Sequence, residues 1–148
     1  MALIVGMAPV AVSVWYAPFL AVSTATLTAD PWSTWLAGGG AIAAFPYGYA
    51  MWLVFFPMTI ITKFAGLPLQ YGYGLTILFA DFCLLYTLDK LLPGRQRLLL
   101  LVYWLSPIVI LACYGLGLND VIPALLLTLS ILFFSRVEFK LAGALCAA

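Results

Sequence analysis

Three aspartates are the residues of this chain whose type and position could support chemistry. Asp30 follows a long apolar stretch, Asp81 lies in the middle of another, and Asp120 lies in a short turn. A carboxylate at a membrane surface can act as a general base, because it accepts a proton in a transition state. A carboxylate inside a membrane helix is costly, which makes Asp81 a candidate for cation binding or proton relay.

Each aspartate also has a purely structural interpretation. Asp30 precedes a proline, and this pair is a typical helix start, so Asp30 is also an N-cap. Asp81 can stay protonated and bond a neighbouring helix through Thr76, Tyr86 or a backbone group. Asp120 and the preceding asparagine can cap the helix that follows them. The sequence leaves the functional and structural interpretations open for all three.

Composition predicts an integral membrane protein. Of 148 residues, 66% are apolar and 7% are charged, with a mean hydropathy of +1.17. A water-soluble domain carries about 25% charged residues. The net charge of +1 and the lack of a basic patch give no reason to expect nucleic acid as a partner. No histidine is present, and the three cysteines lie far apart, so no metal site is assigned.

The apolar stretches predict an all-α, multispanning fold in one transmembrane domain, residues 1–148. Crossing about 30 Å of hydrocarbon takes about 20 helical residues. We expect a plasma or inner membrane, or endoplasmic reticulum, location. The final eight apolar residues are too few to cross, so we expect the N-terminal portion of a longer protein. The predicted spans are residues 3–26, 71–89, 98–116 and 120–135, with the start of a fifth after residue 140 and an external loop with interfacial helices at 28–70.

The loop at 28–70 decides the topology. A short helix is expected from Pro31, ended by the three glycines at 38–40. If 47–66 lies in the interface and the N-terminus is cytoplasmic, Lys63 alone is external and the other five basic residues are cytoplasmic, as the positive-inside rule favours. If 47–66 spans and the N-terminus is external, the charges fit equally well, but Asp30 becomes cytoplasmic. Five aromatic residues of the loop fit an interfacial belt: Trp32, Trp35, Tyr47, Tyr49 and Trp52.

The order of these features resembles the N-terminal part of a known enzyme family. After Asp30 come Phe-Pro-Tyr-Gly-Tyr at 45–49, a span containing Asp81, Trp-Leu-Ser-Pro-Ile-Val-Ile at 104–110, and Gly-Leu-Asn-Asp at 117–120. The pattern resembles GT-C glycosyltransferases, in particular the polyprenyl-phosphate-dependent, mannosyltransferase-like branch that includes the GPI mannosyltransferases. Many members carry a paired acidic motif in the first external loop, where this chain has Asp30 alone.

The resemblance implies a hexosyltransferase reaction, completed by the rest of the chain. A sugar passes from a polyprenyl-phosphate donor to an unidentified acceptor hydroxyl on the non-cytoplasmic face, with inversion. The matching position makes Asp30 the catalytic base. The substrate-binding candidates are Trp32, Trp35, Tyr47, Lys63 and Asp120, and a divalent cation at Asp120 is a further option.

The alternative is a non-catalytic membrane subunit, or a transporter module that works through Asp81. A glycosyltransferase needs Asp30 outside. A transporter needs Asp81 on a water-accessible path, and Asp30→Asn should then have no effect.

Overall fold

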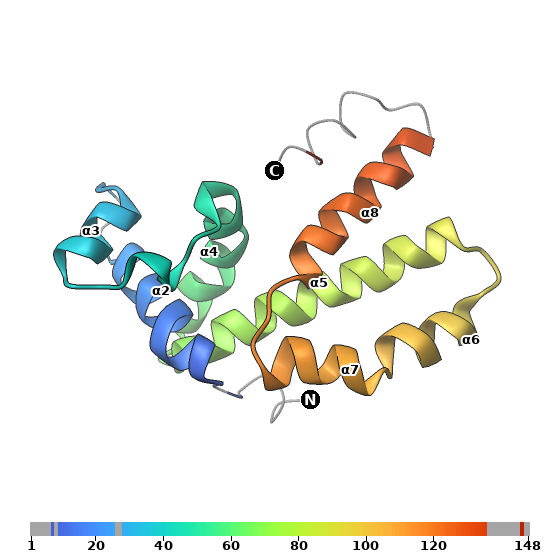
Figure 1. Cartoon of the computed structure of the whole chain (residues 1–148), viewed down its shortest axis with the longest axis horizontal. Helices are drawn as coiled ribbons and strands as arrows, with labels where there is room; N and C mark the ends of the chain where they lie inside the picture. Colours follow the sequence, from blue (N-terminus) through green and yellow to red (C-terminus); the bar gives the residue numbers. More distant parts are fainter. Residues whose placement is uncertain (1–6, 8, 26–27, 136–145, 147–148) are drawn as a thin grey trace. The chain divides into compact units, whose positions relative to one another are not determined.

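The computed structural model describes residue 7 and residues 9–25, 28–135 and 146, and all secondary structure in these ranges is helical (Figure 1). The predicted all-α class is therefore confirmed. The chain divides into two compact units, Met1–Thr76 and Ile77–Ala148, and the helix α5 (Leu69–Leu91) contributes to both. The start of a fifth span, predicted after residue 140, lies outside the described residues apart from Cys146.

The described residues of the first unit form several short helical segments, the longer helix α4 and the beginning of α5. A π-helical stretch, Ala11–Tyr16, runs directly into α2 (Ala17–Ser23). Then follow α3 (Pro31–Ala37), a 3-10 turn at Ile42–Ala44, and α4 (Gly48–Phe64). Helix α3 begins and ends where the sequence predicts. Proline occupies its first turn, and Gly38 follows its last residue.

Stacked aromatic rings form the core of the first unit. Phe19 and Phe45 stack at 4.7 Å with 6° between their planes. Tyr73 stacks on Phe55 at 4.8 Å and on Tyr16 at 5.3 Å. All five side chains are buried. They join α2, α4, the loop before α4 and the start of α5, so aromatic packing holds the 28–70 segment in place.

Helix α4 lies against the first turns of α5 at a glycine. A Cβ added at Gly72 would lie 2.6 Å from Thr62 Oγ1, 3.0 Å from Met58 O and 3.2 Å from Thr59 Cα. Glycine is therefore required at this position for the close approach of the two helices. Helix α4 has 17 residues, and Pro57 lies inside the helix without ending it.

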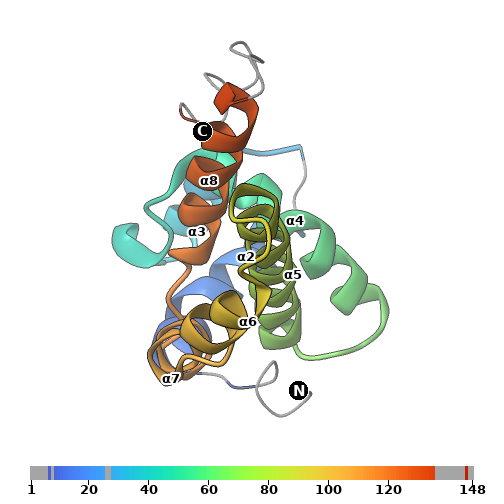
Figure 2. The same cartoon turned by 90° about the vertical axis from the view of Figure 1, so that its right-hand side faces the viewer.

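In the second unit the chain turns back along α5 (Figures 1 and 2). The turn contains Gly94 at φ 80°, a conformation that glycine adopts without steric cost. The returning segment comprises α6 (Gln96–Leu99) with a π-helical stretch (Leu100–Trp104), and α7 (Pro107–Ile110) with another (Leu111–Gly115). Helix α8 (Val121–Ser135) follows.

The segment predicted as a span over 98–116 is bent by 46° between its two arms, Gln96–Trp104 and Pro107–Gly115. The break comes at Leu105–Ser106, immediately before Pro107. Proline has no N–H group for the helical ladder, and its ring disfavours the helical conformation of the preceding residue. Ser106 accordingly has an extended backbone, with φ −65° and ψ 120°.

One described helix, α5, is long and apolar enough to cross a membrane, and the bent segment is a second if its two arms count as one span. At 1.5 Å per residue, 23 residues extend about 35 Å, against about 30 Å of hydrocarbon. The apolar helices Ala11–Ser23, Gly48–Phe64 and Val121–Ser135 are shorter. They overlap the predicted spans 3–26 and 120–135 and the segment 47–66. That any of these three helices crosses the membrane stays a prediction.

Candidate functional site

Asp30 is the N-cap of α3, as the sequence predicts. Its backbone is extended, with φ −61° and ψ 124°, and its Oδ2 accepts a hydrogen bond of 2.7 Å from the Ser33 N–H. Pro31 takes the first helical position, where its missing N–H costs nothing. The carboxylate is exposed to solvent, so the capping bond leaves it accessible.

Tyr49 holds the other oxygen of this carboxylate. Its hydroxyl donates a hydrogen bond to Asp30 Oδ1 from the first turn of α4. The Tyr49 ring contacts Trp32 edge to face at 4.7 Å. The hydrogen bond from Tyr49, with the Ser33 N–H, holds the pKa of Asp30 below its ordinary value, since both stabilise the charged form. Asp30 is thus a fixed, exposed and ionised carboxylate.

The two tryptophans near Asp30 have structural roles. Trp32 donates its indole N–H to Phe45 O at 2.9 Å, and Trp35 donates to Ala41 O at 2.9 Å. A Cβ at Gly40 would lie 2.1 Å from the Trp35 ring, so the glycine run folds back onto that ring. Both side chains are partly exposed. Sugar stacking on them stays a prediction.

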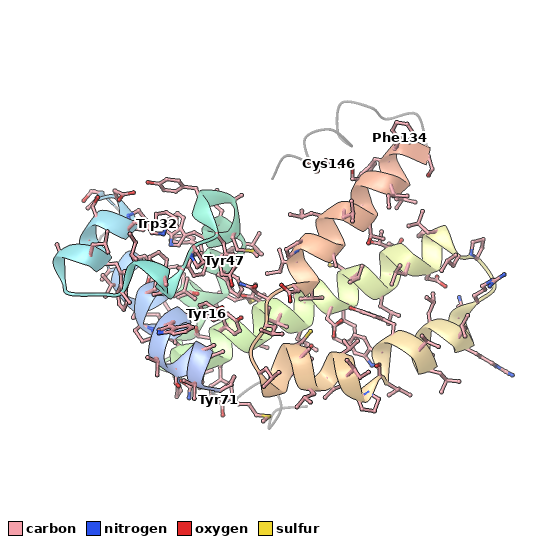
Figure 3. The ribbon with its side chains drawn as sticks, viewed as in Figure 1. Tyr16, Trp32, Tyr47, Tyr71, Phe134 and Cys146 are labelled. Atoms are coloured by element: carbon pink, nitrogen blue, oxygen red, sulfur yellow. The ribbon has the colours of Figure 1, made fainter. Side chains whose placement is uncertain are left out.

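Tyr47 and Lys63 lie in the same unit but have contacts of their own. The Tyr47 hydroxyl lies 2.9 Å from the Tyr16 hydroxyl, and its ring meets Phe45 edge to face (Figure 3). Lys63 is exposed, and its Nζ lies 3.4 Å from Thr24 O. A role of either in substrate binding stays a prediction.

Asp120 belongs to the second unit. It is exposed, and its carbonyl accepts from the Ala124 N–H at 3.1 Å, so its backbone begins α8. The neighbouring Asn119 is buried, and its side-chain Nδ2 has no hydrogen-bond partner among the described residues. Within the described residues, no group of three or more histidine, cysteine or acidic side chains is placed to hold a metal ion.

Asp81 is buried on α5 and bonds both arms of the bent segment. Tyr103, before the break, donates to Oδ1, and Tyr114, after it, donates to Oδ2 at 3.0 Å. The predicted partners are therefore wrong. Thr76 donates instead to a backbone carbonyl of its own helix, and the exposed Tyr86 ring lies under Lys90.

Sequence reasoning missed the residues that hold the two carboxylates. Tyr49 was expected only as part of an aromatic belt. It lies 19 residues from Asp30 in the sequence, and no local pattern indicates the hydrogen bond between them. Tyr103 and Tyr114 did leave a signal. Eleven residues make about three helical turns, which places both tyrosines near one face of a helix.

Comparisons with protein-family models, curated proteins and solved structures found no match for this chain.

Proposed function

We propose that this chain is part of a GT-C-type membrane glycosyltransferase, with Asp30 as the general base. The enzyme transfers a sugar from a polyprenyl-phosphate donor to an acceptor hydroxyl on the non-cytoplasmic face. The observation that carries the proposal is the Asp30 carboxylate, which is exposed yet oriented at both oxygens by Tyr49 and Ser33.

The chemistry requires little more from Asp30 than position and charge. The acceptor hydroxyl gives its proton to the carboxylate as its oxygen bonds to the anomeric carbon of the sugar. The bond from that carbon to the phosphate oxygen breaks, and polyprenyl phosphate leaves with the bonding electrons. The Asp30 carboxylate is ionised at neutral pH, and the hydrogen bonds that lower its pKa fix its position while they reduce its basicity. Each oxygen retains a lone pair for the acceptor, because a carboxylate has about four acceptor positions.

A multi-pass arrangement with Asp30 outside fits this chemistry, because the lipid tail of the donor stays in the bilayer. Helix α5 supplies one crossing by length and composition. The proposal takes α4 as an interfacial helix on the external side, with the basic turn at 93–97 on the cytoplasmic side. A spanning α4 with an external N-terminus is the competing topology, and it would remove Asp30 from the donor's face.

Asp30→Asn tests the base. Asparagine is as good an N-cap as aspartate, so the substitution keeps α3 and removes only the basic oxygen. We expect sugar transfer by the full-length protein in liposomes, supplied with a polyprenyl-phosphate sugar and a crude lipid acceptor, to fall about 10²–10⁴-fold. Asp81→Asn, normalised to folded protein, should retain transfer.

Full transfer by Asp30→Asn would exclude Asp30 as the base. Loss of transfer in Asp81→Asn but not in Asp30→Asn would assign the carboxylate that transfer needs to Asp81.

A further inference from the structure

A pocket of about 360 Å³ opens on the second unit, between the end of α5 and the start of the returning segment. This volume is within the range of small-molecule sites. Its walls are mostly apolar, and two polar side chains, Asp89 and Gln96, also line it. The apolar wall residues are Phe82, Leu85, Leu99 and Leu100, with the ring of Tyr86.

Asp89 lacks a donor in this pocket. Its Oδ1 is buried and has no hydrogen-bond partner among the described residues. The Asp89 side chain as a whole is partly exposed and lines the pocket, so a donor that enters the pocket can approach the carboxylate. The nearby cations do not supply that donor. Lys90 lies over the Tyr86 ring, with its Nζ 5.0 Å from the ring centroid.

The pocket lies where a membrane headgroup would be expected. It is at the C-terminal end of α5, the helix long enough to cross a bilayer, and next to the turn at 92–95. Two exposed arginines, Arg95 and Arg97, flank Gln96 in the sequence. Basic side chains at this depth attract lipid phosphates. One end of the pocket region is therefore apolar, and the other has the Asp89 carboxylate as an acceptor, with Arg95 and Arg97 close by in the sequence.

We propose that this pocket binds a phospholipid with an ethanolamine headgroup. The primary ammonium donates to the Asp89 carboxylate, the phosphate meets Arg95 and Arg97, and an acyl chain lies on the apolar wall. A choline headgroup has no N–H and cannot supply the missing donor. A glycerol headgroup offers hydroxyls but no positive charge. The proposal does not depend on glycosyl transfer.

Native mass spectrometry of the purified full-length protein in detergent tests the proposal, with palmitoyl-oleoyl phosphatidylethanolamine and phosphatidylcholine as probes. We expect the ethanolamine lipid to bind about tenfold more tightly, the size of one hydrogen bond to a charged group. Asp89→Asn should abolish this preference, because it removes the charge at nearly constant shape. Asp120→Asn, an exposed carboxylate outside the pocket, should preserve it.

A second variant tests the apolar wall. Leu100 is 43% exposed, so Leu100→Trp should fill the pocket without disturbing the core, and binding of both lipids should fall. Equal affinity for the two lipids in the unmodified protein would overturn the proposal. A preference that survives Asp89→Asn, or lipid binding unchanged by Leu100→Trp, would also overturn it.

Discussion

Removing one hydroxyl from the Asp81 cluster should loosen the bent segment. Tyr114 is 9% exposed, and its hydroxyl donates to Asp81 Oδ2 at 3.0 Å. Tyr114→Phe keeps the ring and leaves that oxygen without a donor, whereas Oδ1 keeps Tyr103. Hydrogen bonds between membrane helices contribute about 0.6 kcal/mol on average and up to about 1.7. Leaving a buried acceptor without a hydrogen-bond donor costs about 1–3 kcal/mol. We therefore expect the free energy of unfolding to fall by about 1–1.5 kcal/mol.

The assay is equilibrium unfolding in mixed detergent micelles, followed by tryptophan fluorescence. Tyr86→Phe is the matched control. It removes the same hydroxyl from the same type of ring on the same unit, but Tyr86 is 64% exposed, so the change should stay within about 0.5 kcal/mol. A double-mutant cycle isolates the bond. In an Asp81→Leu background, Tyr114→Phe should cost almost nothing. Equal losses for Tyr114→Phe and Tyr86→Phe would refute the reasoning.

Two further predictions concern the first unit. Tyr49→Phe should raise the pKa of Asp30 toward its ordinary value, measured by carboxyl NMR titration, because the strongest of its stabilising hydrogen bonds is lost. Because the pKa of Asp30 is lower in the folded state, its hydrogen bonds stabilise the fold at pH values above the ordinary aspartate pKa. This stabilisation is lost as the pH falls through the lowered pKa of the folded state. An unchanged pKa of Asp30 in Tyr49→Phe would show that Tyr49 does not hold the carboxylate. Gly72→Ala should lower the free energy of unfolding by up to about 2 kcal/mol, because an overpacking cost of about 1–3 kcal/mol opposes a gain of about 1 kcal/mol in helix propensity. Gly38→Ala, whose Cβ would meet its nearest atom at 3.4 Å, should be close to neutral, and equal effects of the two glycine substitutions would contradict the packing argument.

The local parts of the fold were predictable from the sequence. The start of α3 at Asp30-Pro31 and its end at the glycine run depend on capping and backbone freedom, which act within a few residues. The turn at Gly94 is predictable for the same reason.

Features that depend on partners distant in sequence were not predictable. The tyrosines that donate to Asp30 and Asp81 come from other helices, and no local pattern fixes which side chains a fold brings together. Prolines show the same limit. Pro107 breaks its helix and Pro57 does not, although both lie in apolar stretches. Helix α4 buries a face formed by Met51, Phe55, Thr59 and Thr62, whereas Leu100–Trp104 and Pro107–Ile110 bury no residue.

The account depends most on the side of the membrane that Asp30 faces. In a chain whose native cysteines are replaced by alanine, Ala29→Cys and Pro93→Cys place single thiols next to Asp30 and next to the basic turn. A membrane-impermeant maleimide is added to intact cells or to right-side-out vesicles, so that it reaches only the non-cytoplasmic face. It should label Ala29→Cys alone. Both should react after the membrane is permeabilised. Labelling of Pro93→Cys but not Ala29→Cys before permeabilisation would place Asp30 in the cytoplasm and contradict the proposed glycosyl transfer.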